Sequence, residues 1–190
     1  MSAYNMNTRN TVLILMIIGA IAMRFVTFEF QQLSNFTPVG AVALFAGTYF
    51  TDKWKSFFVP LVVLFLSNIG INYLYTGQVA WFSWFDLVTY SCFALTVLIG
   101  ALIKKVNVLN VLAGSVASAV LFWLITDLPF LYGTYYTHDM SGYITSLTNA
   151  LPFLRNMLMS DAVFGLLLYG GFELAKNKYT ILRSRHELAM

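Results

Sequence analysis

The sequence predicts an all-α polytopic membrane protein, built as a single domain with six transmembrane helices. Of its 190 residues, 59% are hydrophobic and only 10% are charged, whereas soluble domains carry about 25% charged residues. The apolar residues also fall into six stretches, most of them close to the ~20 residues that span a bilayer. A chain of this length is expected to form one domain, so we expect residues 1–190 to be one transmembrane unit.

The six predicted spans cover residues 11–28, 37–50, 54–74, 85–103, 108–132 and 151–175. The second stretch is short, and it either crosses with little tilt or begins in a protein-lined recess rather than in lipid. The first stretch contains Ala20-Ile21-Ala22 after Arg9, which resembles a signal peptide. We nevertheless expect it to be retained as a span.

Lysine and arginine are distributed unevenly between the two predicted sides of the membrane. Nine lie on one side: Arg9, Lys53, Lys55, Lys104, Lys105, Lys176, Lys178, Arg183 and Arg185. Arg24 and Arg155 lie on the other. Cytoplasmic loops are enriched in these residues, so we expect both termini in the cytoplasm. Residues 176–190 are expected to form a basic tail at the membrane surface.

Polar and aromatic residues gather in the three predicted outer connections. Hydrogen-bonding groups beside aromatic rings are typical of small-molecule sites, although the aromatic belt of any bilayer interface also attracts tryptophan. We expect a ligand beneath these connections. The candidate binding residues are Asn35, Asn68, Asn72, Trp84, Asp127, Arg155, Asn156 and Asp161.

Asp161 is expected deep in the sixth span, where a carboxylate is normally functional or paired within the bundle. Arg155 precedes it by six residues, which is off the spacing of neighbours on one helix face. We therefore expect its partner on another helix, either Asn68 or Arg24, or in a bound ligand. A structural anchor and a substrate or proton site both remain open.

The second span is expected to begin at Pro38, with Ser34 or Asn35 as its cap. Small residues follow at Gly40, Ala41, Ala43, Ala46 and Gly47. Such residues let helices approach closely, either within the bundle or against another subunit. In the sixth span, we expect the glycines to loosen the helix: Gly165, Gly170 and Gly171.

Catalysis and metal binding find little support. His138-Asp139 lies near Ser141, but adjacency in sequence is not triad geometry, and no nucleophile elbow is present. Cys92 is expected to be a small apolar core residue, with ligation of a cofactor metal as the alternative. We expect no enzyme activity, no cofactor, no metal and no nucleic-acid partner. Because no nucleotide-binding loop is present, uphill transport would draw on an ion gradient or partner chains.

Four segments carry a family resemblance that runs over nearly the whole chain. Residues 35–47 read NFTPVGAVALFAG; the others are VPL at 59–61 with LSN at 66–68, LPFLRN at 151–156, and GGFELAK at 170–176. They resemble an uncharacterised bacterial, Bacteroidetes-type, six-helix membrane protein family. That family is similar to the substrate-binding S components of energy-coupling factor transporters.

The resemblance implies an inner-membrane protein with an S-component-like bundle, which binds a small molecule near the outer face and docks on a transmembrane and ATPase module. Two departures stand out: the region of Gly19 lacks the alanine-x-x-x-alanine docking motif, and Asn68 stands where the family has aspartate. The leading hypothesis is uptake of a vitamin-like or other small metabolite. The alternatives are a scaffold or accessory subunit of a larger membrane complex, and an intramembrane enzyme built on Asp161, His138 or Cys92.

Overall fold

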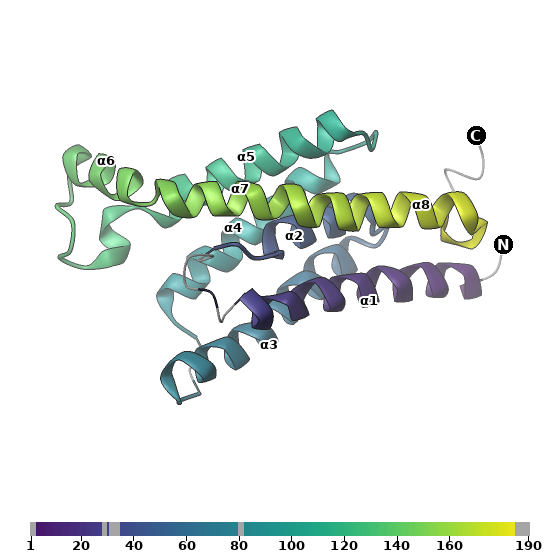
Figure 1. The fold of residues 1–190 in the computed structure, drawn as a ribbon, viewed down its shortest axis with the longest axis horizontal. Coiled ribbons are helices and arrows are strands. Elements are labelled where there is room, and N and C mark those ends of the chain that lie inside the picture. Colours follow the sequence, from purple (N-terminus) through teal and green to yellow (C-terminus); the bar gives the residue numbers. More distant parts are fainter. Residues whose placement is uncertain (1–2, 28–29, 31–34, 80–81, 185–190) are drawn as a thin grey trace.

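The computed structural model describes residues 3–27, 30, 35–79 and 82–184, and this part of the chain is helical with no strand. The α-helices are α1 (Ala3–Thr27), α2 (Val39–Tyr49), α3 (Lys53–Thr76), α4 (Trp84–Ala101), α5 (Val108–Thr126), α6 (Met140–Asn149), α7 (Leu151–Gly165) and α8 (Gly171–Lys178). Shorter elements are η2 (Pro129–Tyr132), η3 (Leu166–Gly170) and η4 (Thr180–Leu182). Figure 1 shows the long helices running roughly side by side along the longest axis.

Five helical segments are long and apolar enough to cross a membrane. They begin in α1, α3, α4, α5 and α7, and the last of them continues through η3 into α8. Five of the six predicted spans therefore correspond to helices of spanning length. The prediction for 37–50 is not confirmed as a full span, because α2 has 11 residues. At 1.5 Å per residue it is about 16 Å long, against a hydrocarbon core of about 30 Å.

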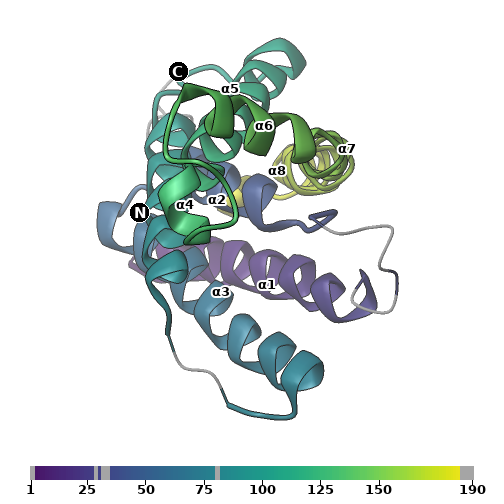
Figure 2. The same ribbon diagram turned by 90° about the vertical axis from the view of Figure 1, so that its left-hand side faces the viewer.

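The short helix α2 forms the centre of the bundle. All of its residues except Thr48 are buried, and it packs against α1, α3, α4, α5 and α7. Figure 2 shows it among these helices. A Cβ on Gly47 would strike the Val97 carbonyl of α4, and one on Gly100 would strike the Leu44 carbonyl of α2. The small residues of α2 thus serve packing within the bundle.

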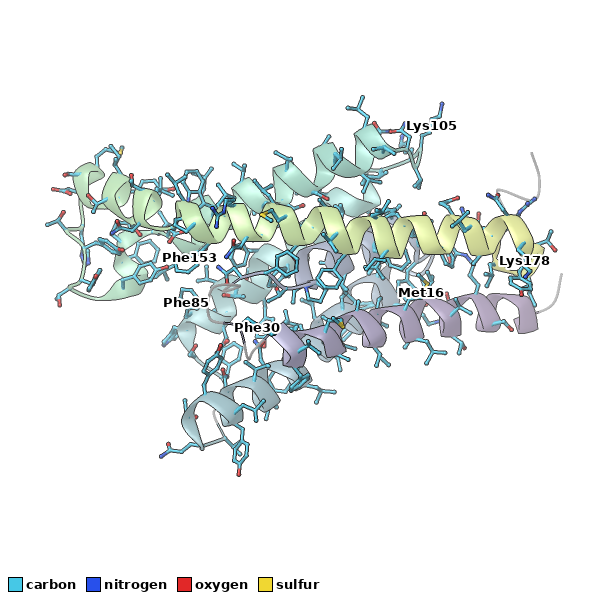
Figure 3. All side chains as sticks on the ribbon, in the orientation of Figure 1. Met16, Phe30, Phe85, Lys105, Phe153 and Lys178 are labelled. Atoms are coloured by element: carbon cyan, nitrogen blue, oxygen red, sulfur yellow. The ribbon has the colours of Figure 1, made fainter. Side chains whose placement is uncertain are left out.

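The two ends of the molecule differ in charge. Lys105 and Lys178 lie at the end where α1 begins and α8 ends, whereas Phe85 and Phe153 lie toward the other (Figures 1 and 3). Arg9 ties this first end together by donating to the carbonyls of Tyr49, at 2.6 Å, and Leu182, at 3.0 Å. We call it the basic end, and the opposite one the cavity end. The predicted tail is described as far as residue 184, and Arg185 lies outside the described residues.

The helix of the last span changes its geometry close to the glycines that were expected to loosen it. The π-helical turn η3 lies between Gly165 and Gly171 and separates α7 from α8. Two features at the cavity end were not predicted. The fifth span ends at Thr126 rather than at residue 132, because the chain turns at Leu128 and Pro129 into η2. The helix α6 follows and folds against the end of α5.

Candidate functional site

A cavity of about 460 Å³ opens toward the cavity end of the bundle, and we call it the large cavity. Its walls come from α1, α3, α4, α5, α6, α7, η2, the start of α2 and the segment that leads into it. Small-molecule sites commonly occupy 300–1,000 Å³. The polar lining residues are Arg24, Asn35, Thr37, Asn68, Asp86, Thr89, Thr126, Asp127, Tyr132, Tyr136, Ser146 and Asn149. The aromatic lining residues without a hydroxyl are Phe85, Phe93, Phe122, Trp123 and Phe153.

Arg24 places a cation in the wall that α1 and α3 share. Its guanidinium donates to the hydroxyl of Ser67 at 2.5 Å, and that hydroxyl donates to the Leu64 carbonyl at 2.8 Å. One turn of α3 is thereby tied to α1. The same side chain lines the large cavity, so it holds the wall and places a positive charge beside the cavity.

Amide groups occupy the next part of the wall. Asn68 donates from Nδ2 to the Tyr90 hydroxyl at 2.9 Å, which joins α3 to α4 and fixes the direction of the amide. Asn35 has a φ of 64°, in the left-handed region that asparagine tolerates better than most residues. Its backbone turns the chain toward the start of α2, and the residue lines the large cavity.

Two hydroxyls in the wall have no hydrogen-bond partner among the described residues. They belong to Thr89 on α4 and Ser146 on α6. Ser146 is 1% exposed, and a buried hydroxyl without a partner costs about 1–3 kcal/mol. Both residues line the large cavity, so a ligand or water there can supply the missing bonds.

The carboxyl groups of the wall lie near its rim. Asp86 accepts from the backbone N–H and the hydroxyl of Ser83, at 2.8 and 2.7 Å, and so completes a capping box at the start of α4. Asp127 accepts from the Tyr132 hydroxyl at 3.2 Å. Burial raises the pKa of Asp127 to about 6, against an opposing effect of the Tyr132 hydroxyl. Its charge therefore changes close to neutral pH.

The helix α6 closes one side of the cavity. Trp123 donates from Nε1 to the Leu147 carbonyl at 3.2 Å, and Tyr143 donates to the Leu124 carbonyl at 2.7 Å. Both bonds fasten α6 to the end of α5. Asp139 begins α6 by accepting from the Gly142 N–H at 2.8 Å, a bond that lowers the pKa of this carboxyl.

The comparison with family models decides the family. Residues 4–184 match a family of unknown function, DUF6580. The chain belongs to this family. No curated protein and no solved structure matches it significantly.

The DUF6580 chain brings three of the eight predicted site residues to the large cavity. They are Asn35, Asn68 and Asp127. Four others lie elsewhere and line neither this cavity nor the cleft described below: Asn72, Trp84, Arg155 and Asn156. Trp84 is 83% exposed, as expected of a tryptophan at a bilayer interface. Asn156 is buried beside Met157, which does line the cavity.

Asp161 meets the start of α2. One carboxylate oxygen accepts from the backbone N–H of Ala41, and the carboxylate lies so close to Gly40 that a Cβ there would be 2.5 Å from Oδ1. The neighbouring Ser160 donates to the Thr37 carbonyl at 2.5 Å. α7 thus supplies the cap that α2 lacks. Pro38 occupies the N-cap position without a side-chain bond, so Asn35 is not the cap, and Ser34 lies outside the described residues.

Asp161 also lines a second, mostly apolar space of about 380 Å³ between α5 and the α7–η3–α8 segment. We call it the lateral cleft. It reaches Asn107 and Glu173 near the basic end. Arg24 and Asn68 were the two side chains expected to pair with this carboxylate, but they bond instead to Ser67 and Tyr90.

Sequence reasoning missed several members of the site. Arg24 enters the sequence analysis only through topology and as a partner of Asp161, although an arginine in the last turn of an apolar span itself indicates a functional site. Ser146 and Thr89 gave no signal, because their role depends on the absence of a partner. Among the described residues no three His, Cys, Asp or Glu side chains are placed to hold a metal ion, and Cys92 is buried and free.

Proposed function

We propose that this protein binds a small metabolite in the large cavity as a step in its uptake across a bacterial inner membrane. The observation that carries the proposal is the lining of that cavity. It combines aromatic rings, amides, the Arg24 cation and two hydroxyls without partners. Those groups are held on six different helices, which is how a preformed site is built.

The lining favours a particular chemical class of solute. Aromatic walls favour a flat ring, and Asn35 and Asn68 offer both donors and acceptors to its edge. Arg24 and Asp127 carry opposite charges above pH 6, so a neutral or zwitterionic molecule is matched better than a strongly charged one. A vitamin-like heterocycle meets these requirements.

The proposed orientation places the basic end in the cytoplasm. This follows from the bias of lysine and arginine toward cytoplasmic loops. The chain would then cross six times, with α2 and the extended residues before it forming the second crossing. The similarity to S components rests on the sequence segments given above, and docking on a shared transmembrane and ATPase module is part of the proposal.

The alternative of a scaffold or accessory subunit has less in its favour. A scaffold needs no binding site, so side chains would be expected to fill the cavity end. Instead, this end holds a cavity of about 460 Å³. The exposed small residues Ala113 and Ala117 on α5 offer a face for another helix. A subunit that binds a solute can use such a face as well.

Ligand-dependent thermal unfolding of the purified protein tests the proposal. A panel of vitamins and heterocyclic metabolites is added to detergent-solubilised protein, and a true ligand at 100 times its Kd should stabilise by about 2.7 kcal/mol. Asn68→Ala should weaken binding at least tenfold. The matched control is Asn72→Ala, one turn away on α3 and outside the cavity lining, which should leave the affinity within twofold. Equal losses in both variants, or no stabilising compound, would contradict the proposal.

A further inference from the structure

The large cavity and the lateral cleft approach each other in the middle of the bundle. On α7, Met157 lines the large cavity and Asp161 lines the lateral cleft. These residues are four apart, which is about 6 Å along the helix axis. On α5, Phe122 lines the large cavity and Ser115 lines the cleft. The two spaces therefore extend from opposite ends toward one level of the bundle.

The start of α2 lies at that level. Thr37 and Val39 line the large cavity, whereas Gly40 and Ala41 meet the Asp161 carboxylate, which lines the cleft. One turn of backbone therefore separates the two spaces. It is held by contacts to α7: Ser160 to the Thr37 carbonyl, the Ala41 N–H to Asp161, and the rings of Phe36 and Phe164 at 6.0 Å.

Polar atoms without partners lie in the same layer. Ser118 stands between Ser115 and Phe122 on one face of α5, is 2% exposed, and has a hydroxyl with no partner among the described residues. Asp161 Oδ1 is likewise without a partner there. Apolar packing alone does not explain such atoms, because each loses its hydrogen bonds to water on burial. A polar solute or water passing this layer would satisfy both.

We infer that the lateral cleft is a second station for the solute, and that the first turn of α2 is the barrier between the two stations. Release of that turn from Ser160 and Asp161 would join the large cavity to a cleft that reaches Asn107 at the basic end. The inference rests on the proposed function and adds a route through this chain's own interior. The cleft is mostly apolar, so the solute it accepts is small and carries few charges.

Thiol labelling from the two sides of the membrane tests the barrier directly. Cys92→Ala removes the single native cysteine, and Ser115→Cys then places a reporter in the lateral cleft. A membrane-impermeant methanethiosulfonate is applied to sealed vesicles of either orientation. With an intact barrier, this thiol should react at least tenfold faster from the side of the basic end than from the side of the cavity end.

Asp161→Ala should abolish this difference by raising the rate from the cavity side at least tenfold. Its matched control is Asp52→Ala, which removes a carboxylate that accepts from the Trp54 N–H at the start of α3, at 3.0 Å. Gly40→Ala is a second, milder variant, because its methyl group would displace the Asp161 carboxyl group without removing it. Gly19→Ala, with nothing within 4 Å, is the control for it.

A reporter that reacts equally from both sides before any change at α2 would overturn the inference. So would a folded Gly40→Ala protein whose reporter stays protected from the cavity side. The labelling uses no solute, so its failure leaves ligand binding in the large cavity untouched. Conversely, an absence of ligand in the thermal assay would contradict the proposed function while the labelling result still reported on the barrier.

Discussion

Asp127 lies partly buried at the rim of the large cavity, where burial raises its pKa to about 6. A carboxyl whose folded-state pKa lies above its unfolded value of about 3.9 stabilises the fold at low pH. That contribution is lost as the pH rises through 6. The shift corresponds to about 3 kcal/mol, which solvent screening reduces to about 1 kcal/mol at such a site.

The free energy of unfolding of the wild-type protein should therefore fall by about 1 kcal/mol between pH 4 and pH 7, relative to Asp127→Asn. Chemical unfolding of both proteins in detergent measures this difference. A difference that stays constant with pH would show that Asp127 ionises as freely in the fold as in the unfolded chain. A change in the opposite direction would show that folding lowers its pKa instead.

Ser146 separates binding from stability. Its buried hydroxyl has no partner among the described residues, so Ser146→Ala should raise the free energy of unfolding by about 1 kcal/mol and weaken solute binding several-fold. Ser160→Ala is the opposite case, because it removes a hydroxyl that bonds to Thr37 and should destabilise. Thermal unfolding with and without ligand distinguishes the two. A Ser146→Ala protein that is less stable would mean that the hydroxyl is already satisfied.

At the scale of the elements, the helix pair α2–α4 depends on two glycines that each face a carbonyl of the other helix. Gly47→Ala would drive its methyl group into the Val97 carbonyl, and overpacking of this kind costs about 1–3 kcal/mol or more. Gly19→Ala meets no atom within 4 Å and should stabilise α1 by roughly 0.5–1 kcal/mol. Melting temperatures in detergent compare them. Equal effects would mean that the two helices do not pack at backbone contact.

Most of the long helices could be predicted from sequence, and the second predicted span shows where hydropathy fails. Composition alone marks α1, α3, α4, α5 and α7 as spanning segments, because lipid demands about 20 apolar residues. Residues 37–50 are just as apolar, but they are apolar because the protein interior surrounds α2. Hydropathy cannot distinguish these two surroundings.

Some residues that line the large cavity could be predicted from the sequence, and others could not because their contacts depend on packing. Asn35 and Asp127 are polar residues near the ends of apolar stretches, and Asn68 interrupts the third stretch. Both patterns are visible in the sequence. The place of Asp161 is not, because its partner is a backbone N–H of α2 rather than a side chain. Trp84 and Arg155 are residue types that are common in binding sites, but both are exposed. Packing decides which face of a helix points into the bundle, and the sequence alone does not show this.

At the scale of the whole molecule, the charge difference between the two ends predicts which end faces the cytoplasm. In a Cys92→Ala background, Tyr135→Cys at the cavity end should react with an impermeant maleimide in intact cells. Lys105→Cys, in the connection between α4 and α5, should react only after the cells are opened. Labelling of Lys105→Cys in intact cells would mean that the basic end faces outward. The proposed orientation and direction of uptake would then be wrong.

The central claim is that the large cavity holds a solute. Native mass spectrometry of protein purified gently from its own membrane tests it most directly. We expect a fraction of the protein to carry one small molecule, and Arg24→Gln to lose that molecule while Arg155→Gln, an exposed arginine outside the cavity lining, retains it. Wild-type protein that carries no small molecule, together with no gain in mass across the metabolite panel, would contradict the claim.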